Sequence, residues 1–167
     1  MTNSTILEID LTRSIEELEG CRWGDAHFKS HVAMASHALR TKPLGSLTLK
    51  EIRLALSQQI GLKFVAPLAP RALAADPTLE TEYYEGDMLR SLLLVPHEFW
   101  RENPDMSAQA EIIVEGFQRV RPTLGAFWEN NIWPRIDEAY KRFAGVLPSL
   151  KWLRPDQGRA PPPGYVE

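Results

Sequence analysis

Three histidines near the amino terminus are the residues whose spacing could support metal chemistry. His27 and His31 are four residues apart and would share one face of a helix, where two imidazoles can ligate one metal ion. A zinc site needs three or four converging ligands, however, and His37 would turn to the far side of the same helix. We therefore expect surface or capping histidines and no metal site. A metal-assisted hydrolase built on these histidines is the weakest of the three hypotheses that the sequence allows.

Covalent and acid–base catalysis have less support. Cys21 precedes Arg22, and a neighbouring cation can stabilise a thiolate, but the turn before Trp23 favours a small buried hydrophobic residue at position 21. The sequence contains no Gly-x-Ser-x-Gly elbow, no phosphate-binding glycine loop and no His-Glu-x-x-His helix. Three further carboxylates are presented mostly to water by a predicted helix: Glu16, Glu17 and Glu19. We expect no catalytic residue, no cofactor and no enzyme activity.

The stretch between Arg71 and Arg90 contains five acidic residues and two adjacent tyrosines but no lysine, arginine or histidine. One interpretation is a solvated loop whose Gly86-Asp87 pair caps the following helix. The other is a binding patch, because carboxylates speed encounter with a basic surface and tyrosines supply contact area at low entropic cost. The candidate binding residues are Glu80, Glu82, Tyr83, Tyr84, Glu85 and Asp87.

Tryptophans and cations also alternate in the carboxy-terminal half of the chain. The tryptophans are Trp100, Trp128, Trp133 and Trp152, and the cations are Arg135, Lys141, Arg142, Lys151 and Arg154. Aromatic rings between cations can stack nucleic-acid bases. Because Trp133 belongs to an apolar stripe, a core position is the stronger interpretation of that residue. The alternative hypothesis is a helical adaptor or regulatory domain that contacts nucleic acid through this basic hairpin.

Composition indicates one globular domain. The chain has 167 residues, 44% hydrophobic and 25% charged, and can bury roughly 70% of its unfolded surface. A net charge of -3 gives no overall attraction to nucleic acid or anionic lipid, so electrostatic binding requires a local patch. The single cysteine fits a reducing compartment. Without a signal-peptide pattern or ~18 uninterrupted apolar residues, we expect a cytoplasmic protein with no membrane partner.

Hydrophobic periodicity predicts a mainly α-helical fold. We expect a single-domain bundle of about six to eight helices over residues 1–154 and a flexible proline-rich tail over 155–167. The alternation of Leu7, Ile9 and Leu11 with polar residues predicts a short amino-terminal strand or arm. The expected helices cover about 15–19, 26–40, 49–60, 64–75, 88–94, 97–102, 113–124 and 133–147. We expect the last two to pack as an antiparallel hairpin.

Two capping boxes mark helix starts most clearly. Ser14 with Glu17, and Thr48 with Glu51, have the spacing at which each side chain bonds the other residue's free backbone N–H. Gly20 can close the first helix. Two of the expected helices have predicted buried stripes. In the helix at 26–40 the stripe is Phe28, Val32, Ala35 and Leu39, and in the helix at 49–60 it is Leu49, Ile52, Leu56 and Ile60. We expect Gly61 to end the second of these helices.

Six short motifs occur in order over the first half of the chain. They are Ser14-Ile-Glu-Glu-Leu-Glu-Gly, Trp23-Gly24, His37-Ala-Leu-Arg-Thr-Lys-Pro-Leu, Leu47-Thr-Leu-Lys-Glu-Ile-Arg-Leu, Gln58-Gln-Ile-Gly-Leu-Lys-Phe-Val-Ala-Pro-Leu-Ala and Tyr84-Glu-Gly-Asp-Met-Leu. With them the chain resembles, over about residues 14–100, the immunity proteins of bacterial contact-dependent growth inhibition (CDI). Two features depart from the family pattern, Lys63-Phe64-Val65 and the second proline, Pro70.

The resemblance implies a small cytoplasmic protein that binds the toxic C-terminal domain of a large exoprotein delivered by neighbouring cells, and neutralises it by occlusion. It leaves the identity of the toxin and the oligomeric state open. A toxin that cuts nucleic acid must gather positive charge to hold phosphate, so an acidic loop could meet that surface. We expect that changing Glu80, Glu82 and Glu85 together to lysine slows association with the toxin and weakens its salt dependence.

Overall fold

The computed structural model describes residues 9–24, 27 and 29–146. In this part of the chain every regular element is a helix, which confirms the predicted mainly α-helical class. The α-helices are α1 (Ile15–Glu19), α2 (His31–Arg40), α3 (Leu49–Ser57), α4 (Leu62–Val65), α5 (Ala69–Ala75), α6 (Asp87–Leu93), α7 (His97–Glu102), α8 (Pro104–Val120), α9 (Gly125–Asn131) and α10 (Trp133–Val146). Three short 3-10 helices are η1 (Leu44–Ser46), η2 (Ala66–Leu68) and η3 (Arg121–Thr123).

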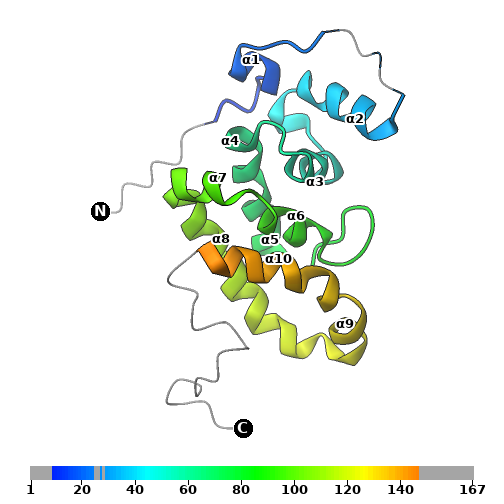
Figure 1. Ribbon diagram of the computed structural model, residues 1–167, viewed down its shortest axis with the longest axis vertical. Coiled ribbons are helices and arrows are strands. Elements are labelled where there is room, and N and C mark those ends of the chain that lie inside the picture. The colour runs from blue at the N-terminus through cyan, green and yellow to red at the C-terminus, as the bar shows by residue number, and fades with distance from the viewer. Residues whose placement is uncertain (1–8, 25–26, 28, 147–167) are drawn as a thin grey trace.

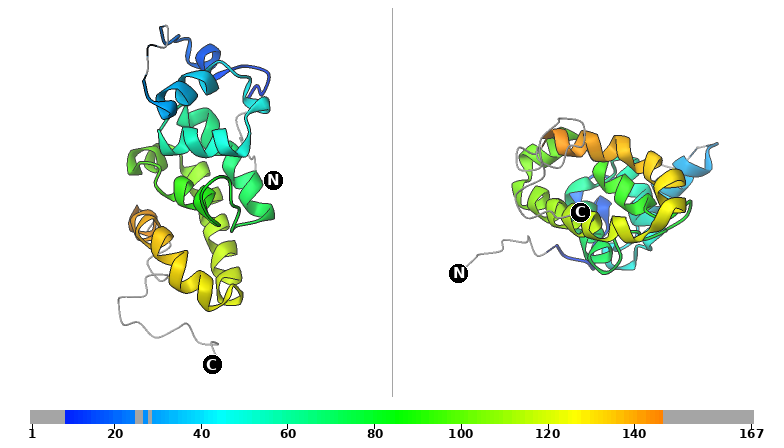
Figure 2. Two further views of the ribbon diagram at one scale, coloured as in Figure 1. Left: turned by 90° about the vertical axis from the view of Figure 1, so that its right-hand side faces the viewer. Right: turned by 90° about the horizontal axis from the view of Figure 1, so that it is seen from below.

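The helices form an elongated stack that follows chain order from one end of the molecule to the other (Figure 1). α1 and α2 lie at one end, α3 and α4 come next, and α5 to α8 fill the middle. α9 lies at the opposite end, and α10 returns from it toward the middle. Two further views show the same arrangement (Figure 2).

The helices are more numerous than predicted, because prolines interrupt one expected helix and end another. α8 is longer than the predicted helix 113–124, since it begins at Pro104. Pro67 and Pro70 each lack an amide donor, and the chain there forms α4, η2 and α5 in succession. Pro122 similarly follows the end of α8, within η3. The hydrophobic periodicity did not reveal α9, which comes next.

The centre of the fold is α6, which is buried on nearly all sides. Its residues Met88, Leu89, Leu92 and Leu93 are at most 2% exposed. α6 packs against α3, α5 and α10, which cover its four apolar residues, and its buried polar residues Asp87 and Ser91 are hydrogen-bonded. Because α6 is buried, its first residue holds the end of the preceding acidic loop in a defined position.

A cluster of aromatic rings joins α8 to α10. The Phe117 ring stacks on Trp133, with centroids 5.8 Å apart and an interplanar angle of 16°. α10 nevertheless packs more against α6 than against any other element. The predicted antiparallel hairpin is therefore replaced by a different arrangement, because η3 and α9 separate α8 from α10 and bring α10 over α6.

Both predicted capping boxes are present. Ser14 Oγ accepts the Glu17 N–H at 3.3 Å, and the Ser14 N–H donates to the Glu17 carboxylate at 2.7 Å. Thr48 and Glu51 form the same pair of bonds, at 3.3 and 2.9 Å. Gly20, with φ of 63°, closes α1 as predicted. These local signals specify helix starts because both partners lie within one turn.

The end of α3 differs from the prediction. The helix ends at Ser57, and the residue that takes the left-handed conformation there is Gln59, with φ of 58°. The Ile60 N–H donates to the Ala55 carbonyl at 2.8 Å, which completes a Schellman closure. Gly61 also has a positive φ, of 55°, but it begins α4.

Two predicted apolar stripes are partly wrong, for a shared reason. In α2, Val32 and Ala35 are exposed whereas Arg40 is buried. In α3, Leu49 is 41% exposed whereas Arg53 is only 7% exposed. Each buried arginine is paired with a carboxylate from another element. Hydrophobic periodicity places charged residues on the solvent-exposed face of a helix. It cannot predict that an arginine will be buried against a carboxylate from elsewhere in the chain.

Residues 7–11 were predicted to form a short strand or arm, and the strand is wrong over the described part, residues 9–11. Asp10 starts a turn there, in which its carboxylate accepts the Thr12 N–H at 3.0 Å and its carbonyl accepts the Arg13 N–H at 3.2 Å. Such local bonds compete with strand pairing. Leu7, Phe28 and the predicted tail at 155–167 lie outside the described residues. None of the helices that the structure describes is both long and apolar enough for a membrane span.

Candidate functional site

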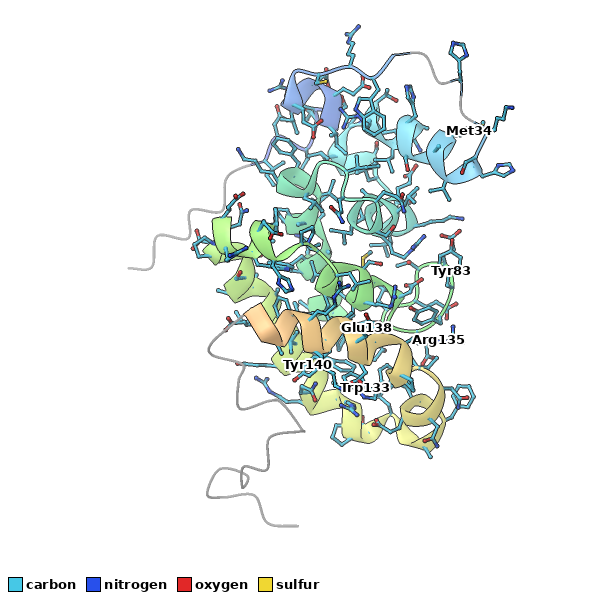
Figure 3. The ribbon with its side chains drawn as sticks, viewed as in Figure 1. Met34, Tyr83, Trp133, Arg135, Glu138 and Tyr140 are labelled. Atoms are coloured by element: carbon cyan, nitrogen blue, oxygen red, sulfur yellow. The ribbon has the colours of Figure 1, made fainter. Side chains whose placement is uncertain are left out.

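Loop 76–86 connects α5 to α6 and carries five of the six candidate binding residues. It bulges from one side of the molecule, and Tyr83 and Arg135 lie on that side (Figure 3). The loop closes on itself, since the Gly86 N–H donates to the Thr78 carbonyl at 2.8 Å. The bulge is therefore a compact, internally bonded structure at the edge of the central helix α6.

Asp87, the first residue of α6, holds the loop from inside. Its Oδ1 accepts the N–H and the hydroxyl of Thr81, both at 2.9 Å. Its Oδ2 accepts the backbone N–H groups of Glu82 and Tyr83, both at 3.0 Å. These four bonds fill the acceptor capacity of a carboxylate, and Asp87 is 3% exposed. Asp87 thus positions the loop and does not face solvent.

Glu82 ties the loop to α3. Its carboxylate binds Lys50 Nζ and Arg53 Nη2, each at 2.5 Å, and its side chain is 22% exposed. The hydrogen bond from Lys50 is the main reason that the pKa of Glu82 lies below its ordinary value; partial burial opposes this shift and Arg53 adds to it. Glu82 is therefore an ionised anchor at neutral pH.

The two tyrosines of the loop have different environments. Tyr83 is 64% exposed, and its ring centroid lies 4.6 Å from Arg53 Cζ. Tyr84 is half-buried, with Arg135 Cζ 5.0 Å from its ring centroid, and burial raises the pKa of its phenol above the ordinary value. Tyr83 is available to a partner, whereas Tyr84 helps to fasten the loop.

Glu80 and Glu85 are exposed and form no ion pair among the described residues. With Tyr83 they make up the outward-facing part of the candidate set. The other three candidates, Glu82, Tyr84 and Asp87, face the scaffold. The structure thus places five of the six residues in one loop and the sixth, Asp87, at the start of α6, and it turns three of them outward and three toward the scaffold.

Cations from other helices surround the loop, which the local sequence could not show. They are Lys50 and Arg53 of α3, Arg90 of α6 and Arg135 of α10. One sequence signal was available: Arg53 lies between the buried Ile52 and Leu56 of α3, next to the apolar face. Its partner Glu82 is 29 residues away in the chain, so the pairing itself has no sequence signal.

A cavity of about 280 Å³ opens beside Tyr83, between the loop, the end of α3 and α6. Apolar side chains, Leu56 and Leu94, form part of its wall. Polar groups form most of the rest, among them Arg53, Arg90 and Ser57. The loop therefore borders a hollow lined by donors as well as presenting carboxylates outward.

The remaining candidate chemistry does not converge. Over the described ranges, no group of three or more His, Cys, Asp or Glu side chains could hold a metal ion. His37 Nε2 lies 2.7 Å from the Gly24 carbonyl oxygen. Cys21 is exposed, so its predicted burial is wrong; the backbone carbonyl of Cys21, and not its thiol, faces the buried Arg40.

The tryptophans of the carboxy-terminal half serve the core. Trp100, Trp128 and Trp133 are at most 9% exposed. Arg121 Cζ lies 3.6 Å from the ring centroid of Trp133. One face of the Trp133 ring is therefore covered by a guanidinium of the same chain. These three rings are not exposed for base stacking. Trp152 lies beyond the last residue that the structure describes.

Comparison with known proteins gives one family. A family model described as CDI immunity proteins matches residues 17–110, which is more than half of the chain and includes the whole of loop 76–86. No curated protein and no solved structure shows significant similarity to the chain.

Proposed function

The chain belongs to the family of CDI immunity proteins, and from this membership we propose that it binds the cognate C-terminal toxin domain of a CDI exoprotein and occludes the active or substrate-binding surface of that domain. The proposed mechanism is steric and electrostatic and involves no reaction of the toxin. We place this encounter in the cytoplasm, where a delivered toxin would meet its target.

The proposal rests on the structure of loop 76–86, in which some residues anchor the loop and others are exposed on its outer side. Asp87 and Glu82 fasten the loop to α6 and α3, so Glu80, Tyr83 and Glu85 are presented on a rigid support. A preorganised surface loses little entropy on binding. An exposed tyrosine between two free carboxylates combines a contact residue with long-range attraction to a basic partner.

We propose further that the toxin is a nuclease. Enzymes that cut nucleic acid concentrate positive charge to hold phosphate, and the outward carboxylates of the loop are complementary to such a surface. No particular contact favours the alternative, an adaptor that binds nucleic acid through α10, because the described tryptophans beside it are buried.

The test starts from the gene neighbourhood. An exoprotein reading frame should lie immediately upstream, and its C-terminal fragment should kill cells unless this protein is co-expressed. The two purified proteins should form a stable complex in size-exclusion chromatography. Cross-linking followed by mass spectrometry should place loop 76–86 at the interface. Failure to protect cells against the adjacent toxin fragment would contradict the proposal, and cross-links confined to other surfaces would move the site away from the loop.

A further inference from the structure

We infer, on the premise of the proposed function, that the cavity beside Tyr83 receives an aspartate or glutamate side chain of the toxin, which the guanidinium groups of Arg53 and Arg90 bind. The cavity has a volume of about 280 Å³, and the exposed Tyr83 of the loop forms part of its wall. In this proposal, basic residues of the toxin contact Glu80 and Glu85, and one acidic residue of the toxin enters the neighbouring cavity.

The cavity has unused hydrogen-bond donors. Arg53 Nε is buried and lacks a hydrogen-bond partner among the described residues, with Asp87 Oδ2 4.0 Å away. Arg90 donates through Nε to the Arg135 carbonyl at 2.8 Å, and its terminal nitrogens have no hydrogen-bond acceptor in the described part of the chain. A buried donor without an acceptor loses its hydrogen bonds to water on folding and gains none in return. A ligand that supplies acceptor oxygens is therefore favoured here.

The carboxylate already in the wall does not satisfy these donors. Both oxygens of Asp87 are occupied by the loop backbone and Thr81, and Glu82 is shared between Lys50 and Arg53. The wall of the cavity itself contains two cations, Arg53 and Arg90, and one carboxylate, Asp87. One further carboxylate would balance the charge, and a guanidinium can bind it through two parallel hydrogen bonds.

Tyr83 gives access to Arg53. Its ring covers the guanidinium at 4.6 Å but is itself 64% exposed, so few contacts hold it. Rotation of this side chain would uncover Arg53, and the ring would then pack on the aliphatic part of an inserted acidic residue. The toxin would exchange water around its carboxylate for charged donors in a partly buried site, where electrostatic attraction is less screened than on an open surface.

A substitution at Ser57 tests this inference with little risk to the fold. Ser57 is the exposed last residue of α3 and lines the cavity. Ser57→Asp would place a carboxylate in the proposed site, repel the carboxylate of the toxin and raise Kd about tenfold or more through faster dissociation. Ser57→Asn is the neutral control of the same shape and should change Kd less than about threefold. Gln59→Glu, from the same wall, should act like Ser57→Asp.

The probe is the C-terminal toxin fragment encoded by the adjacent exoprotein gene, and binding is measured by surface plasmon resonance. Each Asp and Glu of the fragment is also changed singly to Asn or Gln; one of these variants should lose its sensitivity to Ser57→Asp in a double-mutant cycle. Equal weakening by Ser57→Asp and Ser57→Asn would overturn the carboxylate assignment. Unchanged binding by all three variants would overturn the cavity assignment, whereas a fragment that never binds the unaltered protein would count against the proposed function itself.

Discussion

Asp87 is a charged residue used as an internal support. A carboxylate before an apolar helix is usually read as a cap or as a surface charge, but this one folds the preceding loop back onto the start of α6 through four hydrogen bonds. The exposed residues of the loop depend on it, although Asp87 is itself nearly inaccessible.

Removal of the Asp87 carboxylate should therefore loosen the loop. Asp87→Ala leaves the N–H groups of Thr81, Glu82 and Tyr83 without their acceptor, and we expect a loss of about 2–4 kcal/mol in the free energy of unfolding by urea. Hydrogen exchange at these amides should become faster. Asp76→Ala is the control, because the Asp76 side chain is hydrogen-bonded only to Thr78, in an exposed turn. A similar loss there would mean that Asp87 has no special role.

Gly86 is the second residue on which the loop depends. Its φ is 85°, and a Cβ at this position would lie 2.6 Å from Ile136 Cδ1 of α10. Gly86→Ala combines an unfavourable backbone conformation with overpacking, so we expect about 2–4 kcal/mol of destabilisation in urea unfolding. Gly116→Ala in α8 is the matched control, since nothing lies within 4 Å of its added Cβ. That change should be neutral or stabilising by up to about 1 kcal/mol, and equal losses at both sites would refute the steric argument.

Among the elements, α1 depends on a capping box that is sensitive to pH. The Ser14 backbone N–H, followed by its hydroxyl, lowers the pKa of the Glu17 carboxyl below 4.5. A lowered pKa in the folded state contributes stability that is complete above the unfolded value and is lost as the pH falls through the folded value. Stability should consequently decrease as the pH falls below about 4.5.

Glu17→Gln isolates this effect, because glutamine keeps the shape of the cap but does not ionise. At pH 7 the variant should unfold at a lower urea concentration than the unaltered protein. The difference between the two midpoints should shrink as the pH falls below 4.5, where the native carboxylate also loses its charge. A difference that stays constant from pH 7 to pH 3 would show that ionisation of Glu17 does not matter to the cap.

The sequence predicted elements well where their signals are local. The capping boxes at Ser14 and Thr48 bring together residues three positions apart, and both are present. Helix ends were less predictable, since Gln59 takes a left-handed conformation that favours glycine. The buried faces of α2 and α3 were predicted wrongly because Arg40 and Arg53 lie inside, held by distant carboxylates that periodicity cannot reveal.

The same limit applies to the candidate site. The six predicted residues do gather in and around one loop, as contiguous sequence requires, but their orientations depend on α3, α6 and α10. The buried role of Asp87 and the pairing of Glu82 were inaccessible to sequence because both follow from tertiary packing. The cavity beside Tyr83 has wall residues from two helices and a loop, and no local pattern indicated it.

For the whole molecule, charge distribution matters more than the net charge of -3. Cations from three helices partly neutralise this acidic loop, which leaves Asp76, Glu80 and Glu85 as its carboxylates without an ion pair in the described part of the chain. Of these, Asp76 bonds Thr78 in the turn after α5, whereas Glu80 and Glu85 flank the exposed Tyr83. Long-range attraction to a basic toxin would therefore depend on these two residues, while Glu82 contributes to the support of the loop.

Exchange of both free charges should slow the approach of the toxin. The double variant Glu80→Lys/Glu85→Lys leaves the Glu82 anchor intact, so we expect a stable protein whose association rate with the toxin fragment falls about tenfold or more at low ionic strength. The dependence of that rate on salt should flatten, because screening then has less attraction to remove. Stopped-flow fluorescence at several salt concentrations measures both quantities. Glu102→Lys/Asp105→Lys makes the same change of net charge at the exposed junction of α7 and α8. If this control slows association as much as the loop variant does, the attraction comes from total charge, and loop 76–86 does not direct the encounter.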